Sequence, residues 1–134
     1  MKTRTKNIEQ TVTIAAEPTS VFEALMNSAQ HAEFTGEDAR IDPKPGGAFA
    51  CYGDYINGVT LELEPNKRIV QAWRSRNWPQ GTYSIITFNL KRKAGGKTEL
   101  QFAQIGVPAN DYADKKKGWR THYWEPLKAF LQGN

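Results

Sequence analysis

The feature that most constrains this chain is a change in the spacing of its apolar residues. The spacing is first that of a series of short strands and then that of one final helix. Between Ala48 and Ile105, turn-forming residues return about every ten residues and separate segments in which apolar and polar residues alternate. The turns fall at Tyr52–Asp54, Glu64–Lys67, Asn77–Gly81 and Ala94–Gly96. This spacing predicts an antiparallel meander. After Pro108, large apolar residues recur at spacings of four, four and three, which is typical of one helix face; they are Trp119, Tyr123, Leu127 and Phe130.

The segment before the meander predicts one more strand and two short helices. Apolar and polar residues alternate from Ile8 to Ala15, as in a half-buried strand. Pro18 then stands in the first turn of a helix, where its missing N–H costs nothing. Ser28 is placed to cap a second short helix that runs to about Phe34.

Together these elements predict an α+β fold, in which a curved antiparallel sheet of about six strands surrounds a long C-terminal helix. We expect this helix to begin between Asn110 and Lys115. Pro126 lies inside it and should kink it or leave a carbonyl group without its usual partner. No linker or repeat divides the 134 residues, so the sequence predicts one domain over 1–134.

One face of each strand should point at the helix, and the residues on these faces form the candidate ligand-binding set. The set is Phe49, Cys51, Gln71, Trp73, Phe88, Phe102, Gln104, Trp119 and Tyr123. The two glutamines need partners if they are buried. They can bond each other, a water or a ligand, or lie at a wet end of the sheet. The set therefore either fills a packed core, with Cys51 unreactive inside it, or lines a cavity for an apolar molecule.

The chain is mildly basic, with a formal net charge of +4. Its short Lys and Arg clusters are typical of solvated surface, and most aromatic residues fall at positions expected to be buried, so we predict no nucleic-acid partner. The candidate residues for binding a protein partner are Arg74, Arg76, Trp78, Lys116 and Arg120. An exposed Trp78 would favour a partner surface, whereas a Trp78 folded over the cavity mouth would favour a ligand gate.

The sequence contains few residues that could act in catalysis or bind a metal. His31 and His122 are far apart in the sequence, and neither has a cysteine or carboxylate at the spacing of metal ligands. Cys51 is the only cysteine, so no internal disulfide can form. The sequence predicts no catalytic residues, metal site or cofactor, and hence a protein that is not an enzyme. No apolar run is long enough to span a membrane and no secretory signal is recognisable, which predicts a cytoplasmic protein.

Several short motifs resemble one known family. They are Gly46-Gly47 with Phe49, Gly58, Pro65–Val70, Trp73-Arg74, Trp78-Pro79 with Gly81, Thr98–Leu100, Gly106–Pro108 and Gly118-Trp119. In this order the chain from Ile8 to Leu131 resembles the C-terminal-type domain of the activators of heat-shock-protein-90 ATPase. That family lies within the START/SRPBCC helix-grip superfamily.

The resemblance implies a co-chaperone-like binding domain whose partner is a heat-shock-protein-90-type chaperone of the stress response. The superfamily also implies an alternative: a carrier or sensor that holds an apolar or lipid-like molecule between sheet and helix. Two-domain activators carry a separate N-terminal domain, whereas seven residues precede Ile8 in this chain. We therefore expect a modest affinity for the chaperone, because avidity from two linked contacts is lost.

Overall fold

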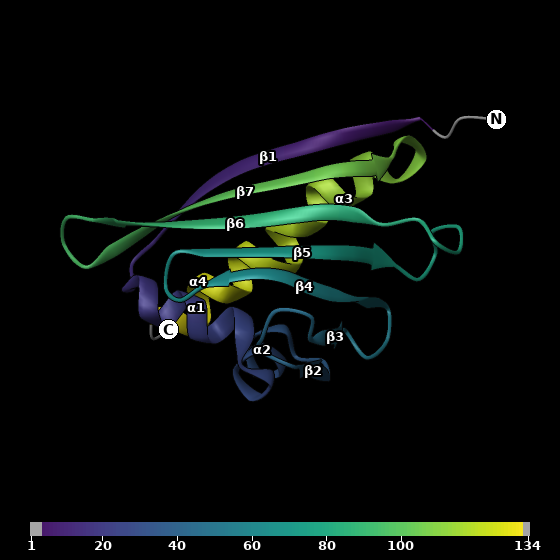
Figure 1. Ribbon diagram of the computed structural model, residues 1–134. Helices are drawn as coiled ribbons and strands as arrows, with labels where there is room; N and C mark the ends of the chain where they lie inside the picture. Colours follow the sequence, from purple (N-terminus) through teal and green to yellow (C-terminus); the bar gives the residue numbers. More distant parts are fainter. Residues whose placement is uncertain (1–3, 133–134) are drawn as a thin grey trace.

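The structure, a computed structural model, describes residues 4–132 and is built on one seven-stranded sheet (Figure 1). The elements in chain order are β1 (Thr5–Ile14), α1 (Pro18–Met26), α2 (Ser28–Thr35), β2 (Ala39–Ile41), β3 (Ala48–Cys51), β4 (Ile56–Glu64), β5 (Arg68–Ser75), β6 (Ser84–Lys93), β7 (Lys97–Pro108), the short 3₁₀ helix η1 (Ala109–Asp111), α3 (Tyr112–Trp119), the π-helical turn η2 (Arg120–Trp124) and α4 (Glu125–Leu131). The predicted α+β architecture is confirmed.

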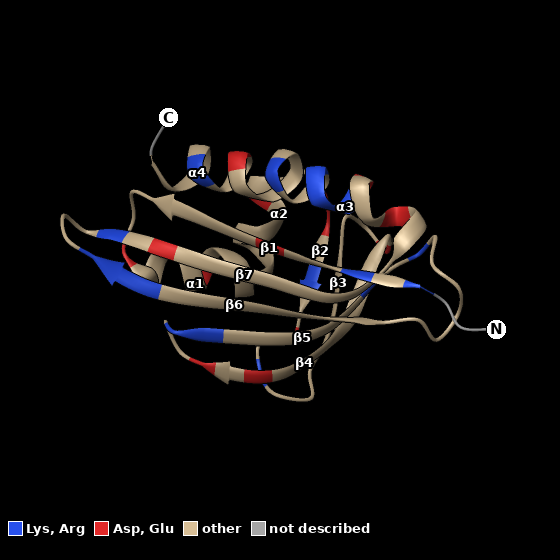
Figure 2. Ribbon diagram, turned by 90° about the horizontal axis from the view of Figure 1, so that it is seen from above, with Lys and Arg blue, Asp and Glu red and all other residues tan. Residues whose placement is uncertain are grey.

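The strands follow the order β1-β7-β6-β5-β4-β3-β2, and every neighbouring pair is antiparallel. The sheet has seven strands rather than about six, because β2 adds a strand of three residues. A strand of this length has too few residues to show an alternating pattern. From above, α3 and α4 run along one side of the sheet (Figure 2). The buried face of α1, with Val21, Ala24 and Leu25, belongs to the same core.

The first two helices form where the sequence predicts them, but the cap of α2 differs. Asn27 precedes the helix, and its Oδ1 accepts a hydrogen bond from the Gln30 N–H at 2.9 Å. The prediction of Ser28 as the capping residue is therefore wrong by one position; both residue types are good caps, so composition does not separate them. The Ser28 hydroxyl instead accepts a hydrogen bond from the Ile41 N–H at 2.9 Å and so ties α2 to β2.

The C-terminal helix begins with α3 at Tyr112, inside the expected range, and Pro126 disturbs it as expected. Pro126 has no N–H to donate to the His122 carbonyl. One turn earlier the helix widens into η2, where the Glu125 N–H bonds the Arg120 carbonyl five residues back. The Tyr52 hydroxyl donates to the His122 carbonyl at 2.6 Å, so the turn between β3 and β4 supplies the missing partner.

Gly58 lets the sheet close tightly around its own side chains. A Cβ at this position would lie 1.8 Å from the Ala72 carbonyl oxygen and 2.8 Å from the Phe49 ring. Phe49 and Trp73 are the cross-strand partners of Gly58 on either side. The missing side chain therefore makes room for two large inward-facing rings.

Candidate functional site

The predicted inward-facing residues lie together between the sheet and the C-terminal helix. All nine members of the candidate ligand-binding set are buried. Their rings are in mutual contact: the centroids of Phe102 and Trp119 are 4.3 Å apart, those of Phe88 and Phe102 5.4 Å, and those of Trp73 and Trp119 5.5 Å. The expected aromatic cluster is confirmed, and Trp124 extends it, 5.2 Å from Phe102.

A buried chain of hydrogen bonds fixes this cluster to the sheet. The Trp119 indole N–H donates to Gln104 Oε1 at 2.7 Å, Gln104 Nε2 donates to the Ser84 hydroxyl at 2.9 Å, and that hydroxyl donates to the Trp73 carbonyl at 3.1 Å. Gln104 is thus not at a wet end of the sheet: it is fully buried and satisfied from both ends of its amide. This chain links α3 to β7, β6 and β5 and holds the helix in one position.

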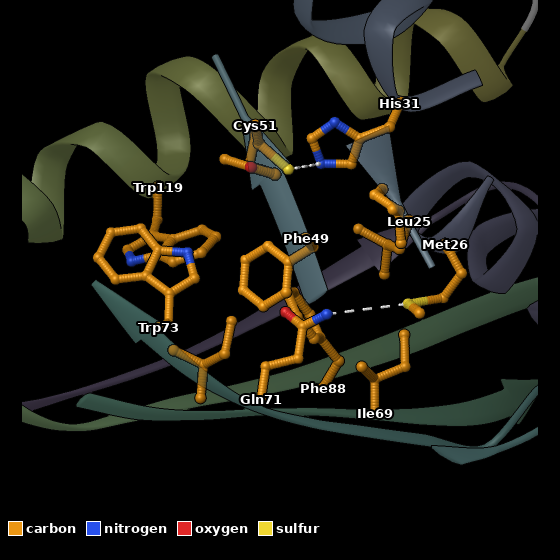
Figure 3. Close-up of a pocket in the computed structure, with 13 residues that line it drawn as sticks. Leu25, Met26, His31, Phe49, Cys51, Ile69, Gln71, Trp73, Phe88 and Trp119 are labelled. Atoms are coloured by element: carbon orange, nitrogen blue, oxygen red, sulfur yellow. Dashed lines mark hydrogen bonds between the residues drawn. The ribbon is translucent and has the colours of Figure 1, made fainter. Parts of the chain in front are cut away.

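The second glutamine of the set, Gln71, does not bond Gln104. Its amide nitrogen donates weakly to the Thr60 hydroxyl at 3.3 Å and approaches the Met26 sulfur at 3.9 Å. Figure 3 shows it among the side chains that line a small interior cavity. Gln104 therefore makes two short hydrogen bonds, whereas Gln71 makes only weak ones and lies beside the cavity.

This interior cavity has a volume of about 20 Å³, which is room for one water molecule. Pockets that take small molecules usually measure about 300–1,000 Å³. Seven of the predicted set line it, namely Phe49, Cys51, Gln71, Trp73, Phe88, Trp119 and Tyr123. Phe102 and Gln104 do not line it; they pack behind Trp119. The aromatic side chains have filled the space between sheet and helix, so the interior is a packed core.

The structure brings together two residues whose contact the sequence did not predict. His31 on α2 and Cys51 on β3 are both buried, and His31 Nε2 lies 3.7 Å from the Cys51 sulfur (Figure 3). Burial raises the pKa of the Cys51 thiol to about 12, which the neighbouring Tyr123 only partly offsets. Burial also lowers the pKa of His31 to about 4. Both groups are neutral near pH 7, so the pair lacks the thiolate that a cysteine nucleophile requires.

The larger opening is a groove of about 390 Å³ on the surface, where the turn between β3 and β4 meets α3 and η2. Its lining is mostly aromatic: Tyr52, Tyr55, Ile56, Trp73, Asp114, Lys115, Gly118, Trp119, His122 and Tyr123. Trp73, Trp119 and Tyr123 line both spaces and so stand between the groove and the interior cavity. The groove is not evident from the sequence, because only the fold brings the tyrosines of one turn against a helix about 60 residues away.

A compact charge cluster lies beside the groove, which Asp114 and Lys115 help to line. The Lys115 ammonium lies 2.8 Å from Asp111 Oδ2 and 3.2 Å from Asp114 Oδ2. Burial opposes its charge, but the two carboxylates outweigh that effect and raise the pKa of Lys115. The Lys115 side chain is therefore held in place by two ion pairs at the groove.

Trp78 is neither exposed nor folded over a cavity mouth. It is 4 % exposed, its ring centroid lies 5.5 Å from that of Trp73, and its indole N–H donates to Asp111 Oδ2 at 2.6 Å. Trp78 therefore cannot present its ring to a partner, and it does not line the groove. The structure gives it a third role, as an anchor between the β5–β6 loop and the start of α3.

The other predicted partner residues do not form one patch. Arg74 is half-buried and donates to the carbonyl groups of Trp78 and Thr82 in its own loop. Arg76, Lys116 and Arg120 are exposed, with Arg76 over the Tyr55 ring and the other two on the C-terminal helix. Figure 2 shows acidic as well as basic residues along α3 and α4, so these helices do not present a purely basic face.

Two further features are absent from residues 4–132, the part of the chain that the structure describes. Within these residues, His, Cys, Asp and Glu form no group of three or more that could hold a metal ion. None of the helices described there is both long and apolar enough to cross a membrane.

An antiparallel sheet closed over one C-terminal helix, with an aromatic core between them, is the helix-grip fold. Residues 15–132 match the family described as Activator of Hsp90 ATPase homolog 1-like protein, and the chain belongs to this family. It is 28% identical over 127 residues to the activator of 90 kDa heat shock protein ATPase homolog of Dictyostelium discoideum, covering 95% of this chain and 33% of that protein.

Two other comparisons agree. The chain is 29% identical over 116 residues to the activator of 90 kDa heat shock protein ATPase homolog 1 of Homo sapiens, covering 87% of this chain and 34% of the human protein. The crystal structure of PFC0360w, an HSP90 activator from Plasmodium falciparum, superposes with a TM-score of 0.89 at 23% identity, covering 94% of this chain and 96% of the other. The chain thus spans about a third of the length of the curated relatives it matches.

Proposed function

We propose that this chain is a co-chaperone-like domain that binds a heat-shock-protein-90-type ATPase and biases its conformational cycle. The observation that carries the proposal is the family match over residues 15–132. The Dictyostelium and human relatives named as activators of the 90 kDa heat shock protein ATPase align with 95% and 87% of this chain. Binding can shift the cycle only if the domain prefers one state of the ATPase over another.

The packed interior supports a function carried by the surface of the domain. The enclosed cavity between sheet and helix has room for one water, so it offers no buried pocket for a substrate. The buried Cys51–His31 pair is neutral near pH 7 and supplies no nucleophile. These two properties favour a binding domain over an enzyme.

The exposed cations are the residues we assign to the contact. Arg76, Lys116 and Arg120 are exposed, and the chain carries a formal net charge of +4. Arg74 and Trp78 act behind them by holding the β5–β6 loop in shape through their hydrogen bonds. A basic surface that meets an acidic partner binds more weakly as salt rises.

The test is an ATPase assay with the chaperone from the same organism, with and without this chain, at low and physiological salt. We expect binding and a change in ATPase rate that shrinks with salt. Lys116→Glu with Arg120→Glu should weaken both, whereas Lys97→Glu, an exposed charge reversal at the start of β7, should leave both unchanged. If neither binding nor a rate change occurs at high protein concentration in either salt, the proposal fails.

The groove favours a second candidate function, the binding of a flat apolar molecule. Its volume of about 390 Å³ lies within the range of small-molecule pockets, and its walls are mostly aromatic. Trp73, Trp119 and Tyr123 of the predicted ligand-binding set line it, whereas the rest of the set lies in the packed interior or behind Trp119. The ligand would then sit between α3–η2 and the ends of β4 and β5, where Ile56 and Trp73 line the groove, outside the enclosed cavity.

A thermal-shift screen of flat apolar compounds tests this candidate. A compound that binds should raise the melting temperature with the logarithm of its concentration. Gly118→Leu should abolish that rise, because a Cβ at Gly118 meets only His122 at 3.6 Å and the longer side chain would occupy the groove. Ala113→Leu, at an exposed position of the same helix, is the matched control. No thermal shift with any compound, and no apolar molecule in an extract of the purified protein, would exclude this candidate.

A further inference from the structure

One indole N–H at the wall of the groove has no hydrogen-bond partner. Three of the four tryptophans donate this hydrogen to a side-chain oxygen at 2.6 or 2.7 Å. The fourth is Trp73, which is 3% exposed, and within residues 4–132 no acceptor is placed to bond its Nε1. Buried tryptophans usually find a partner for this donor. The Trp73 donor is therefore left to water or to a bound molecule.

The Trp73 N–H borders open space rather than being sealed in the core. Among the described residues, the only fully enclosed polar side-chain atom without a partner is His31 Nδ1, so Trp73 Nε1 keeps some accessible surface. Trp73 lines both the groove and the one-water cavity, and Figure 3 shows its ring beside that of Trp119. The rings of Trp78 and Trp119, with centroids 5.5 Å from that of Trp73, offer it no strong acceptor.

Two hydroxyls and one ammonium that line the groove already have partners. The Tyr52 hydroxyl donates to the His122 carbonyl at 2.6 Å, and the Tyr55 hydroxyl donates to Asn77 Oδ1 at 3.2 Å. The Lys115 ammonium is paired with two carboxylates, one of which is exposed. An anionic ligand would therefore meet an occupied lysine and a like charge beside it. The Trp73 N–H is left as the donor that an uncharged acceptor can use.

We propose that Trp73 Nε1 selects the ligand of the groove, which is a flat, uncharged aromatic molecule that carries a carbonyl oxygen. The proposal rests on the second candidate function above and adds the chemistry of the ligand to it. An indole N–H can only donate, so the ligand atom against it must be an acceptor. A bare hydrocarbon would displace water from this N–H and leave it unpaired, which costs binding free energy. A carbonyl oxygen removes that cost while the ring lies against the aromatic walls.

A water in the small cavity is the alternative partner for the Trp73 N–H. The cavity has room for one water, and Trp73 lines it. If such a water keeps the N–H satisfied when the groove is filled, a ligand carbonyl brings no advantage. Hydrocarbon and ketone would then respond in the same way to the loss of the indole N–H, so a matched pair of ligands separates the two cases.

Fluorene and fluorenone form such a pair, because they share one flat fused-ring frame and differ by a carbonyl group. Equilibrium dialysis gives the dissociation constant of each probe for the unmodified chain and for Trp73→Phe. The ratio of the fluorene constant to the fluorenone constant should fall by about fivefold or more in Trp73→Phe. Comparing ratios removes the difference in hydration between the probes, because that difference is the same for both chains.

The matched control is Trp124→Phe, which removes another buried indole. Its N–H already donates to Gln10 Oε1 at 2.7 Å, and Trp124 does not line the groove. The ratio of the two dissociation constants should therefore stay that of the unmodified chain. Circular dichroism confirms that each variant is folded.

A second measurement uses the unmodified chain, so it does not depend on how a variant folds. Each of the four tryptophans gives one indole signal in a proton–nitrogen correlation spectrum, and through-bond experiments assign that of Trp73. Both probes bring similar ring currents, but only the ketone accepts a hydrogen bond. Fluorenone should therefore move the Trp73 indole proton further downfield than fluorene does, while the other three indole protons respond alike to both probes.

The outcomes separate this proposal from the candidate function on which it rests. If neither probe binds, both fail. If both bind but the ratio is unchanged in folded Trp73→Phe, or the two probes move the Trp73 proton equally, the groove remains a binding site and this proposal alone is overturned. Binding of fluorenone that survives Gly118→Leu would also contradict it, because the probe would then lie outside the groove.

Discussion

The two faces of the sheet differ more than its alternating sequence suggests. On β6, Ile86 points at the helix and is 1% exposed, while its neighbour Ile85 points outward and is 40% exposed. The inner face is closed by aromatic rings and by hydrogen bonds that satisfy its polar groups. The outer face leaves apolar residues open to solvent. The comparison teaches that the inner face determines the fold, and that any binding function must use the outer surfaces or the groove.

The largest expected effect tests the inner face. Phe88→Ala should lower the free energy of unfolding by about 3–5 kcal/mol, because it leaves a cavity among Phe102, Trp119 and Trp124. Ile85→Ala, on the outer face of the same strand, should change the free energy of unfolding by no more than about 0.5 kcal/mol. Chemical denaturation measures both. Equal losses would erase the contrast between the two faces.

The next largest effect is a pH dependence of stability that comes from the buried His31. The pKa of His31 is about 4 in the folded chain against 6.5 in the unfolded chain, so between these values the unfolded state binds more protons. Stability from this group is fully present above pH 6.5 and is lost as the pH falls toward 4. Between pH 7 and pH 5 the loss should be about 2 kcal/mol. In His31→Leu this part of the pH dependence should disappear from denaturation curves; an unchanged dependence would mean that His31 is not buried as a neutral ring.

Two glutamines of β7 compare the inner and outer faces again, and the expected change in the free energy of unfolding is similar or smaller. Gln104→Leu removes the partner of the Trp119 indole and of Ser84, and should cost about 1–3 kcal/mol through the buried groups left unpaired. Gln101→Leu changes the same residue type on the outer face, where Gln101 bonds the carboxylate of Glu99. It should be close to neutral. A large loss at Gln101 with none at Gln104 would reverse the assignment of the two faces.

Much of the fold follows from the sequence because burial alternates along most of the strands, most clearly along β6. Ser84, Ile86, Phe88 and Leu90 share the inner face of β6, as their spacing predicts, and the helix start and the disturbance at Pro126 also follow from local chemistry. The hydrogen bond from Tyr52 to the His122 carbonyl does not, because a local pattern cannot name a partner 70 residues away.

The candidate site was predicted less well, for the same physical reason. The nine inward residues were found, but whether they enclose a pocket depends on how completely their rings fill the space. Trp78 was expected at the surface or over a cavity, and its burial depends on Asp111, which lies 33 residues later. Which outward-facing residues lie side by side, such as Ile85 and Ile105, depends on the strand registers, whereas the sequence indicates only the alternation along each strand.

The most direct test of the central claim, that the interior is closed and the chain works through its exterior, is the labelling rate of its single thiol. Cys51 is 4% exposed and burial raises its pKa to about 12, so a thiol reagent should modify it only when the chain unfolds. The exposed thiol of a Thr13→Cys variant with Cys51→Ser should react at the rate of a free cysteine under the same conditions. The account predicts that native Cys51 reacts orders of magnitude more slowly and reaches the reference rate only in denaturant. Rapid modification of Cys51 in the native chain would contradict it, because the space between sheet and helix would then be open.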